Sequence, residues 1–91
     1  MNRPPQESEK RFIEAYDLYA DALFRHCAFR LMDREKAIEL MQETYMKVWE
    51  YLAQGHEVEN LRAFLYRVAN NLVIDFARQR AKRKTTSLEE L

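Results

Sequence analysis

The spacing of apolar residues along the chain predicts three helical segments. In each, apolar side chains recur at steps of three and four positions, the spacing of one face of an α-helix. The first segment runs from Ser8, the expected N-cap, toward Met32. A break near Tyr19–Asp21 is an alternative to one long helix, although neither Gly nor Pro marks it. The apolar set of this segment is wide enough to face two neighbours: Phe12, Ile13, Tyr16, Tyr19, Ala20, Leu23, Phe24, Cys27 and Leu31.

The other two segments carry clear start and stop signals. Asp33 is the expected N-cap of the second helix, Gln54-Gly55 its expected end, and Asn60 the N-cap of the third. The expected buried stripe of the second helix is Ala37, Ile38, Met41, Tyr45, Val48, Trp49 and Leu52, and that of the third is Leu61, Phe64, Leu65, Val68, Leu72 and Phe76. We therefore predict an all-α fold, a small bundle of three to four helices in a single domain.

Length and composition fix the expected boundaries and setting. Of the 91 residues, 1–7 are expected to be a disordered lead, 8–84 the helical domain and 85–91 the start of a linker. No apolar run approaches the roughly 20 residues that cross a bilayer, and no signal-peptide pattern opens the chain. The single Cys27 excludes an intrachain disulfide and fits a reducing compartment. We expect a cytoplasmic protein without membrane insertion.

The net charge of zero conceals a segregation of charge along the chain. Residues 1–58 hold eight Lys/Arg against eleven Asp/Glu, whereas residues 62–84 hold seven against one. A protein with one face toward phosphates and another toward a basic partner would use this arrangement.

The third helix concentrates the groups that contact nucleic acids. Cations attract phosphates, carboxamides can read base edges, and an exposed ring can stack on an unpaired base. A solvated amphipathic helix with a basic end is the alternative. The residues on or near the side away from the apolar stripe are Arg62, Tyr66, Arg67, Asn70 and Asn71, followed by Arg78, Arg80, Lys82, Arg83 and Lys84.

The second helix has an acidic outer face. Like charges at four-residue steps repel each other slightly. The face is therefore either a solvent-exposed surface on which this small repulsion is tolerated, or a docking surface for a basic, partly apolar partner. Its members are Glu35, Glu39, Glu43, Met46 and Glu50, with Gln42 and Lys47 flanking.

Asp75 interrupts the apolar stripe of the third helix. It projects about 20° from Val68, so we expect a buried carboxylate. An unpaired buried charge costs several kcal/mol, on the order of 3–5, so a partner is expected. Arg30, His26 and Arg78 are the candidates, with Arg30 preferred.

The sequence disfavours an enzyme. His26 and His56 lie in different segments without metal-ligand spacing, and Cys27 sits in an apolar stripe. One glycine leaves no phosphate-cradling loop. We predict no catalytic residues, no metal and no cofactor.

Two motifs resemble one known family. Asp33–Trp49, DREKAIELMQETYMKVW, resembles the pattern D-x-E-x-A-x-D-L-x-Q-E-T-F-x-x-x-W, and Asn60–Arg80 resembles F-x-A-W-L-Y-R-I-A-R-N-x-x-I-D-x-x-R. Both patterns belong to the second conserved region of bacterial RNA polymerase sigma factors of the extracytoplasmic-function (ECF) class. The resemblance covers roughly Phe12 to Leu91, with both motifs in the family's order.

The resemblance implies two binding surfaces. The second helix would bind the clamp helices of the polymerase β′ subunit through Glu39, Gln42, Glu43, Met46 and Lys47. The third helix and the loop before it would bind and help melt the non-template strand of the promoter's minus-ten element and hold a flipped base. That role falls to Arg62, Tyr66, Arg67, Asn70, Asn71 and Arg78, with His56 and Asn60 at the pocket mouth. An anti-sigma factor is a further expected partner. A helical protein-interaction module without DNA contact is the alternative function.

The sequence also departs from the family pattern. Phe64 stands where Trp is common, which a core position tolerates. Asn70 stands where Arg is frequent, so one phosphate contact is lost or a different base is preferred. Such sigma factors normally continue through a linker into a helix-turn-helix domain, which these residues lack. An excised domain and a truncated protein are the two explanations, and excision is favoured.

Overall fold

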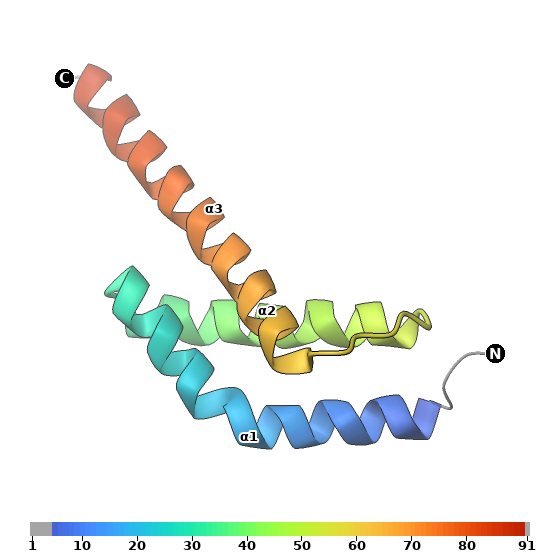
Figure 1. Cartoon of the computed structure of the whole chain (residues 1–91). Helices are drawn as coiled ribbons and strands as arrows, with labels where there is room; N and C mark the ends of the chain where they lie inside the picture. Colours follow the sequence, from blue (N-terminus) through green and yellow to red (C-terminus); the bar gives the residue numbers. More distant parts are fainter. Residues whose placement is uncertain (1–4, 91) are drawn as a thin grey trace.

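The fold consists of three α-helices that pack on one another. The computed structural model describes the backbone of residues 5–90 and the side chains of residues 7–83. α1 (Pro5–Leu31), α2 (Arg34–Ala53) and α3 (Leu61–Glu90) each contact the other two. α1 and α2 run in opposite directions, and α3 crosses them before its C-terminal half projects beyond the bundle (Figure 1). No strand occurs among residues 5–90, and the predicted all-α class is confirmed.

α1 is one continuous helix that bends near its middle, where Figure 1 draws it in light blue. It begins at Pro5, so Ser8 lies inside the helix and its prediction as the N-cap is wrong. Proline fits the first helical turn because its fixed φ is helical and its missing N–H would have no partner there. Residues 5–7 of the expected disordered lead are thus helical, and residues 1–4 lie outside the described residues. At the other end, Met32 has a left-handed φ of 54°.

The predicted boundaries of α2 agree with the structure, as does the start of α3. The Asp33 carboxylate accepts a hydrogen bond from the Lys36 backbone N–H at 3.0 Å. α2 ends with Gln54 as its C-cap, and Gly55 follows with a φ of 94° that suits glycine. The Asn60 side chain caps α3 by accepting from the Ala63 N–H at 3.0 Å. α3 continues to Glu90, six residues beyond the expected end of the helical domain.

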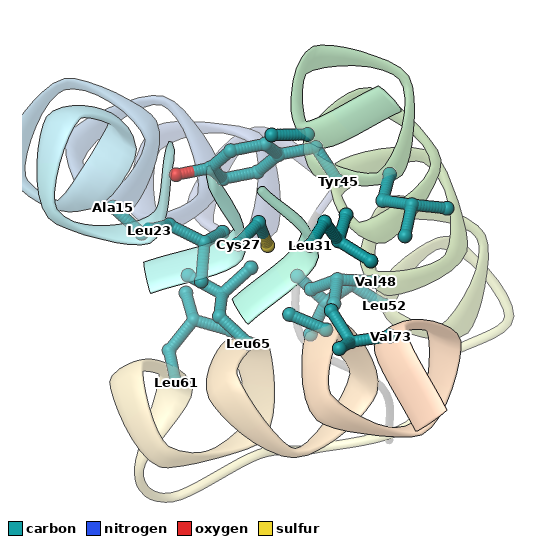
Figure 2. Packing of buried hydrophobic residues seen from close by; sticks show 13 residues of the cluster. Ala15, Leu23, Cys27, Leu31, Tyr45, Val48, Leu52, Leu61, Leu65 and Val73 are labelled. Carbon is teal, nitrogen blue, oxygen red and sulfur yellow. The ribbon is translucent and has the colours of Figure 1, made fainter. Parts of the chain in front are cut away.

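The core lies where the three helices meet (Figure 2). α1 contributes Ala15, Leu23, Cys27 and Leu31; α2 contributes Ala37, Leu40, Tyr45, Val48 and Leu52; α3 contributes Leu61, Leu65, Ala69 and Val73. Thr44 is also fully buried, and its hydroxyl donates to the Leu40 carbonyl at 2.7 Å.

The buried faces are rotated relative to the predicted stripes. Ile13 and Tyr16 of α1 and Ile38 of α2 are exposed, although all three were expected in the core. On α3 the fully buried line follows four-residue steps, and the predicted Phe64, Val68, Leu72 and Phe76 lie half-buried at its edge. Within the described residues, no helix has the length and apolarity to cross a membrane.

Candidate functional site

The acidic stripe of α2 (Glu35, Glu39, Glu43, Met46 and Glu50) lies in solvent as predicted. All five side chains are exposed, Met46 by 64%, and the flanking Gln42 and Lys47 are exposed too. Lys36 forms an ion pair with Glu39 at 2.7 Å, which partly neutralises the first half of the stripe. The Lys36 ammonium also lies 4.7 Å from the centre of the Phe76 ring, so α3 helps to hold it.

An open groove of about 440 Å³ separates the C-terminal half of α2 from α3. Its lining combines rings, carboxylates and amides: Lys47, Glu50, Tyr51, Gln54, Phe64, Val68, Asn71, Leu72 and Asp75. Tyr51 stacks on His56 with 4.1 Å between ring centres and 16° between ring planes, and its centre lies 5.1 Å from that of Phe64. The predicted pocket-mouth residue His56 thus packs on the groove residue Tyr51, but it is not itself one of the lining residues.

The loop beside the groove is held by two hydrogen bonds near its C-terminal end. The Arg11 guanidinium of α1 donates to the Val58 carbonyl at 2.9 Å. At the end of the loop, Asn60 uses its side-chain oxygen to cap α3. Asn60 is exposed, and its side-chain oxygen takes part in the cap, so the residue stands at the junction of the loop and α3.

Asp75 is exposed and lines the groove, so the prediction of a buried, paired carboxylate is wrong. Its preferred partner Arg30 is exposed as well and donates instead to the His26 ring at 3.1 Å. The prediction centred the apolar stripe on Val68, whereas the buried line passes through Val73. Two residues along a helix turn about 200°, so Asp75 points nearly opposite to Val73.

A second polar cluster lies between α1 and α3. His26 Nε2 is 2.6 Å from the Asn70 side-chain oxygen, and the His26 ring meets the Tyr66 ring edge-to-face at 5.1 Å. The Arg62 guanidinium lies over the Tyr66 ring, 5.1 Å from its centre. Tyr66 is half-buried rather than freely exposed, because these two side chains cover part of its ring.

The cations of α3 divide into two kinds. Arg62, Arg67 and Arg78 are exposed. Arg80 instead holds the bundle together: it donates to the Leu31 carbonyl at 3.3 Å, meets the Asp33 carboxylate at 3.5 Å and lies 4.7 Å from the Phe76 ring centre. Arg80 thus connects α3 to the end of α1 and the N-cap of α2.

The structure therefore separates residues that the sequence placed on one DNA-binding face. Asn71 borders the groove toward α2, whereas Tyr66 and Asn70 turn toward α1. Sequence reasoning missed Tyr51, Phe64 and Asp75 as groove residues. Tyr51 lies one helical turn before Gln54-Gly55, the expected end of the second helix, and this position could have indicated that its ring lies beside the loop. Among the described residues, no three His, Cys, Asp or Glu side chains are grouped to hold a metal ion.

Comparison with known proteins identifies the family. The family model "Sigma-70 region 2" matches residues 15–83, most of the chain. The chain belongs to the sigma-70 region 2 family. This result confirms the resemblance found in the two sequence motifs, and it places the chain among proteins of transcription initiation.

One curated relative supports the ECF class. The chain is 28% identical over 74 residues to "ECF RNA polymerase sigma factor SigM" of Bacillus subtilis (strain 168). The match covers 81% of this chain but only 45% of SigM, so the chain spans less than half of that relative. No solved structure matches the chain.

Proposed function

We propose that this region 2 domain recognises promoters as part of RNA polymerase in the cytoplasm. The acidic stripe of α2 docks on the β′ clamp helices, and the groove with the outer face of α3 binds the melted non-template strand of the minus-ten element. An anti-sigma factor is the third partner that the family resemblance suggests. The observation that carries the proposal is the ring-lined groove beside the anchored loop on this family's fold.

The groove suits a nucleobase better than a phosphate. A base can stack on Tyr51 or Phe64, and the Asn71 carboxamide can both donate and accept at a base edge. Glu50 and Asp75 would repel phosphates, but their carboxylates can accept hydrogen bonds from exocyclic amino groups of bases. The phosphates of the DNA backbone would instead contact the exposed guanidinium groups of Arg67 and Arg78 outside the groove.

The acidic stripe suits a basic protein surface. Its charges face solvent and project away from the buried side of α2, so they contribute to docking without being needed for packing. Met46 adds an adaptable apolar contact at the centre of the stripe. Lys47 and Glu50 line the groove at the edge of this face, so the two proposed surfaces are neighbours on α2.

Replacing Glu39, Glu43 and Met46 together by Ala tests the docking surface. Because the three side chains are exposed, the free energy of unfolding should change by less than about 0.5 kcal/mol. Binding to β′ clamp helices should weaken, more at low salt than at high salt. The control Glu14→Ala/Asp17→Ala also removes two negative charges, but from exposed positions on α1, and it should bind the clamp helices as the wild type does. Wild-type binding by the triple variant would contradict this docking surface.

Tyr51→Ala and Asn71→Ala test the DNA surface on single-stranded oligonucleotides at fixed salt. Loss of the stacking ring should cost about 1–3 kcal/mol of binding free energy, and loss of the carboxamide should reduce the preference for the minus-ten strand over a scrambled strand. Phe29→Ala removes an 82% exposed ring from α1 and serves as the control. If the wild type bound both strands equally, the alternative of a protein-interaction module without DNA recognition would be favoured.

A further inference from the structure

His56 covers one face of a groove residue. The His56 ring stacks on Tyr51 with 4.1 Å between ring centres and 16° between ring planes. Both side chains are exposed, and Tyr51 lines the groove to which the proposed function assigns a base. A flat ring at this distance and angle occupies the position that a stacked nucleobase would take on the same face. A base can therefore reach this face of Tyr51 only if the imidazole leaves it.

The stack on Tyr51 is a weak restraint on His56. Among residues 7–83, the His56 side chain has no hydrogen bond and no ion pair. On one side the chain is fixed at Gly55, whose N–H donates to the Leu52 carbonyl at 3.0 Å, and on the other at the Val58 carbonyl, which accepts from Arg11 at 2.9 Å. The imidazole lies between these two points. It can rotate away from Tyr51 about its own side-chain torsions without breaking a hydrogen bond.

Tyr51, by contrast, is held in place. It belongs to α2 and precedes the buried Leu52. Its ring centre lies 5.1 Å from that of Phe64, which is half-buried and packs against the core. When His56 rotates away, a positioned aromatic ring with an uncovered face therefore remains at the groove.

The exchange of the imidazole for a base favours the base. An aromatic pair of two exposed side chains contributes less free energy than the stacking of a nucleobase on an aromatic side chain. A base also carries edge groups that can bond to the Asn71 carboxamide and the Glu50 carboxylate in the groove. The imidazole is thus an occupant that a base can displace, and the cost of displacing it is subtracted from the affinity for DNA.

We infer that the His56 ring takes the place of the base in the free domain: it stacks on Tyr51 until a nucleobase of the minus-ten strand replaces it. This inference rests on the proposed function, because it assumes that the groove binds that strand. The family resemblance placed His56 among the DNA-binding residues at the pocket mouth. Competition gives the histidine the opposite effect on affinity, because a ring that must be displaced weakens binding.

Affinities of the full chain for single-stranded minus-ten oligonucleotides, at fixed pH and salt, test this exchange. His56→Ala should bind about two- to tenfold more tightly than the wild type, the range that corresponds to one aromatic pair. His56→Phe keeps a ring on Tyr51 and should bind no more tightly than the wild type. In a Tyr51→Ala background no ring remains to be covered, so His56→Ala should have no effect there. Tyr51→Leu provides that background if circular dichroism shows that Tyr51→Ala is unfolded.

Strands that lack one base show where the exchange occurs. Oligonucleotides carry an abasic site at each position in turn. At one position the wild type and His56→Ala should bind the abasic strand equally, because no base competes for the Tyr51 ring. At the other positions His56→Ala should stay the tighter binder. In nuclear magnetic resonance spectra of the wild type, the intact strand should move the His56 ring-proton signals toward those of an unstacked histidine.

The possible failures are distinguishable. If the wild type does not separate minus-ten from scrambled strands, the proposed function fails. If it does separate them but His56→Ala binds equally or more weakly, the inference about His56 is overturned while the proposed function stands. Tighter binding by His56→Ala in the Tyr51→Ala background as well, or at every abasic position, would assign the effect to the loop and would also overturn the inference.

Discussion

Tyr45 carries a polar group into the core without a partner. The side chain is 4% exposed, and among the described residues its hydroxyl has no hydrogen-bond partner (Figure 2). Burial raises the pKa of Tyr45 to about 12, and the nearby Tyr16 and Tyr66 act in the same direction. The family pattern resembled by this segment has Phe at this position. We therefore expect Tyr45→Phe to stabilise the domain.

The magnitude follows from the hydroxyl alone, because the ring contacts are retained. The Tyr45 ring centre lies 5.8 Å from that of Phe12 and 4.6 Å from that of Tyr16, and a phenylalanine ring keeps both contacts. An unsatisfied buried polar group costs about 1–3 kcal/mol, and the small void left by the oxygen returns part of this. We expect the free energy of unfolding to rise by about 1 kcal/mol at pH 7.

The same substitution should change the response to alkali. A folded pKa above the unfolded value near 10 means that the fold accepts the neutral phenol more readily than the phenolate. This preference contributes fully to stability below about pH 10, and the contribution is lost as the pH rises through about 12. The difference in free energy of unfolding between Tyr45→Phe and the wild type should therefore be about 2 kcal/mol larger at pH 11.5 than at pH 7. Urea unfolding followed by circular dichroism at both pH values measures this difference. A destabilised Tyr45→Phe, or the same gap at both pH values, would refute the reasoning.

Three further substitutions test the helix junction and the DNA surface. Arg80→Ala should lower the free energy of unfolding by about 0.5–1.5 kcal/mol, because its partly exposed contacts join α3 to the end of α1 and the start of α2. Arg78→Ala should leave the free energy of unfolding unchanged in the same urea titration. Asp33→Ala should cost about 0.5–2 kcal/mol in thermal or urea unfolding, because it removes the N-cap of α2. Arg67→Ala should reduce the slope of log affinity against log salt for single-stranded minus-ten DNA by about 0.7, and an unchanged slope would exclude a phosphate contact there.

Local signals in the sequence predicted the helix boundaries that depend on short-range contacts. The caps at Asp33 and Asn60 follow from side chains that bond to backbone groups three residues away, and the turn at Gly55 follows from the positive φ that glycine adopts readily. The buried faces were predicted less well. Each four-residue step rotates a residue by about 40° around the helix axis. A stripe that is correctly centred at one end of a long helix therefore lies on a different face at the other end. Asp75 was misplaced for this reason.

The candidate site depends on contacts between helices that sequence spacing does not specify. Asn70 and Asn71 are neighbours in the chain, yet one meets His26 of α1 and the other borders the groove formed with α2. Arg80 looked like one more cation of a basic stretch until its contacts with the ends of two helices were known. The acidic stripe was predictable because unpaired carboxylates are costly to bury, so a helix face rich in Glu is turned to solvent.

The central claim is that one small domain carries two neighbouring but separate surfaces, one for polymerase and one for the non-template strand. Chemical-shift mapping of the isotope-labelled chain tests it most directly, in one titration with a β′ clamp-helix fragment and one with a minus-ten oligonucleotide. The account predicts that the fragment shifts Glu43 and Met46, whereas the oligonucleotide shifts Tyr51, Arg67 and Asn71. Perturbation of the same residues by both ligands, or no shift at the groove with DNA, would contradict it.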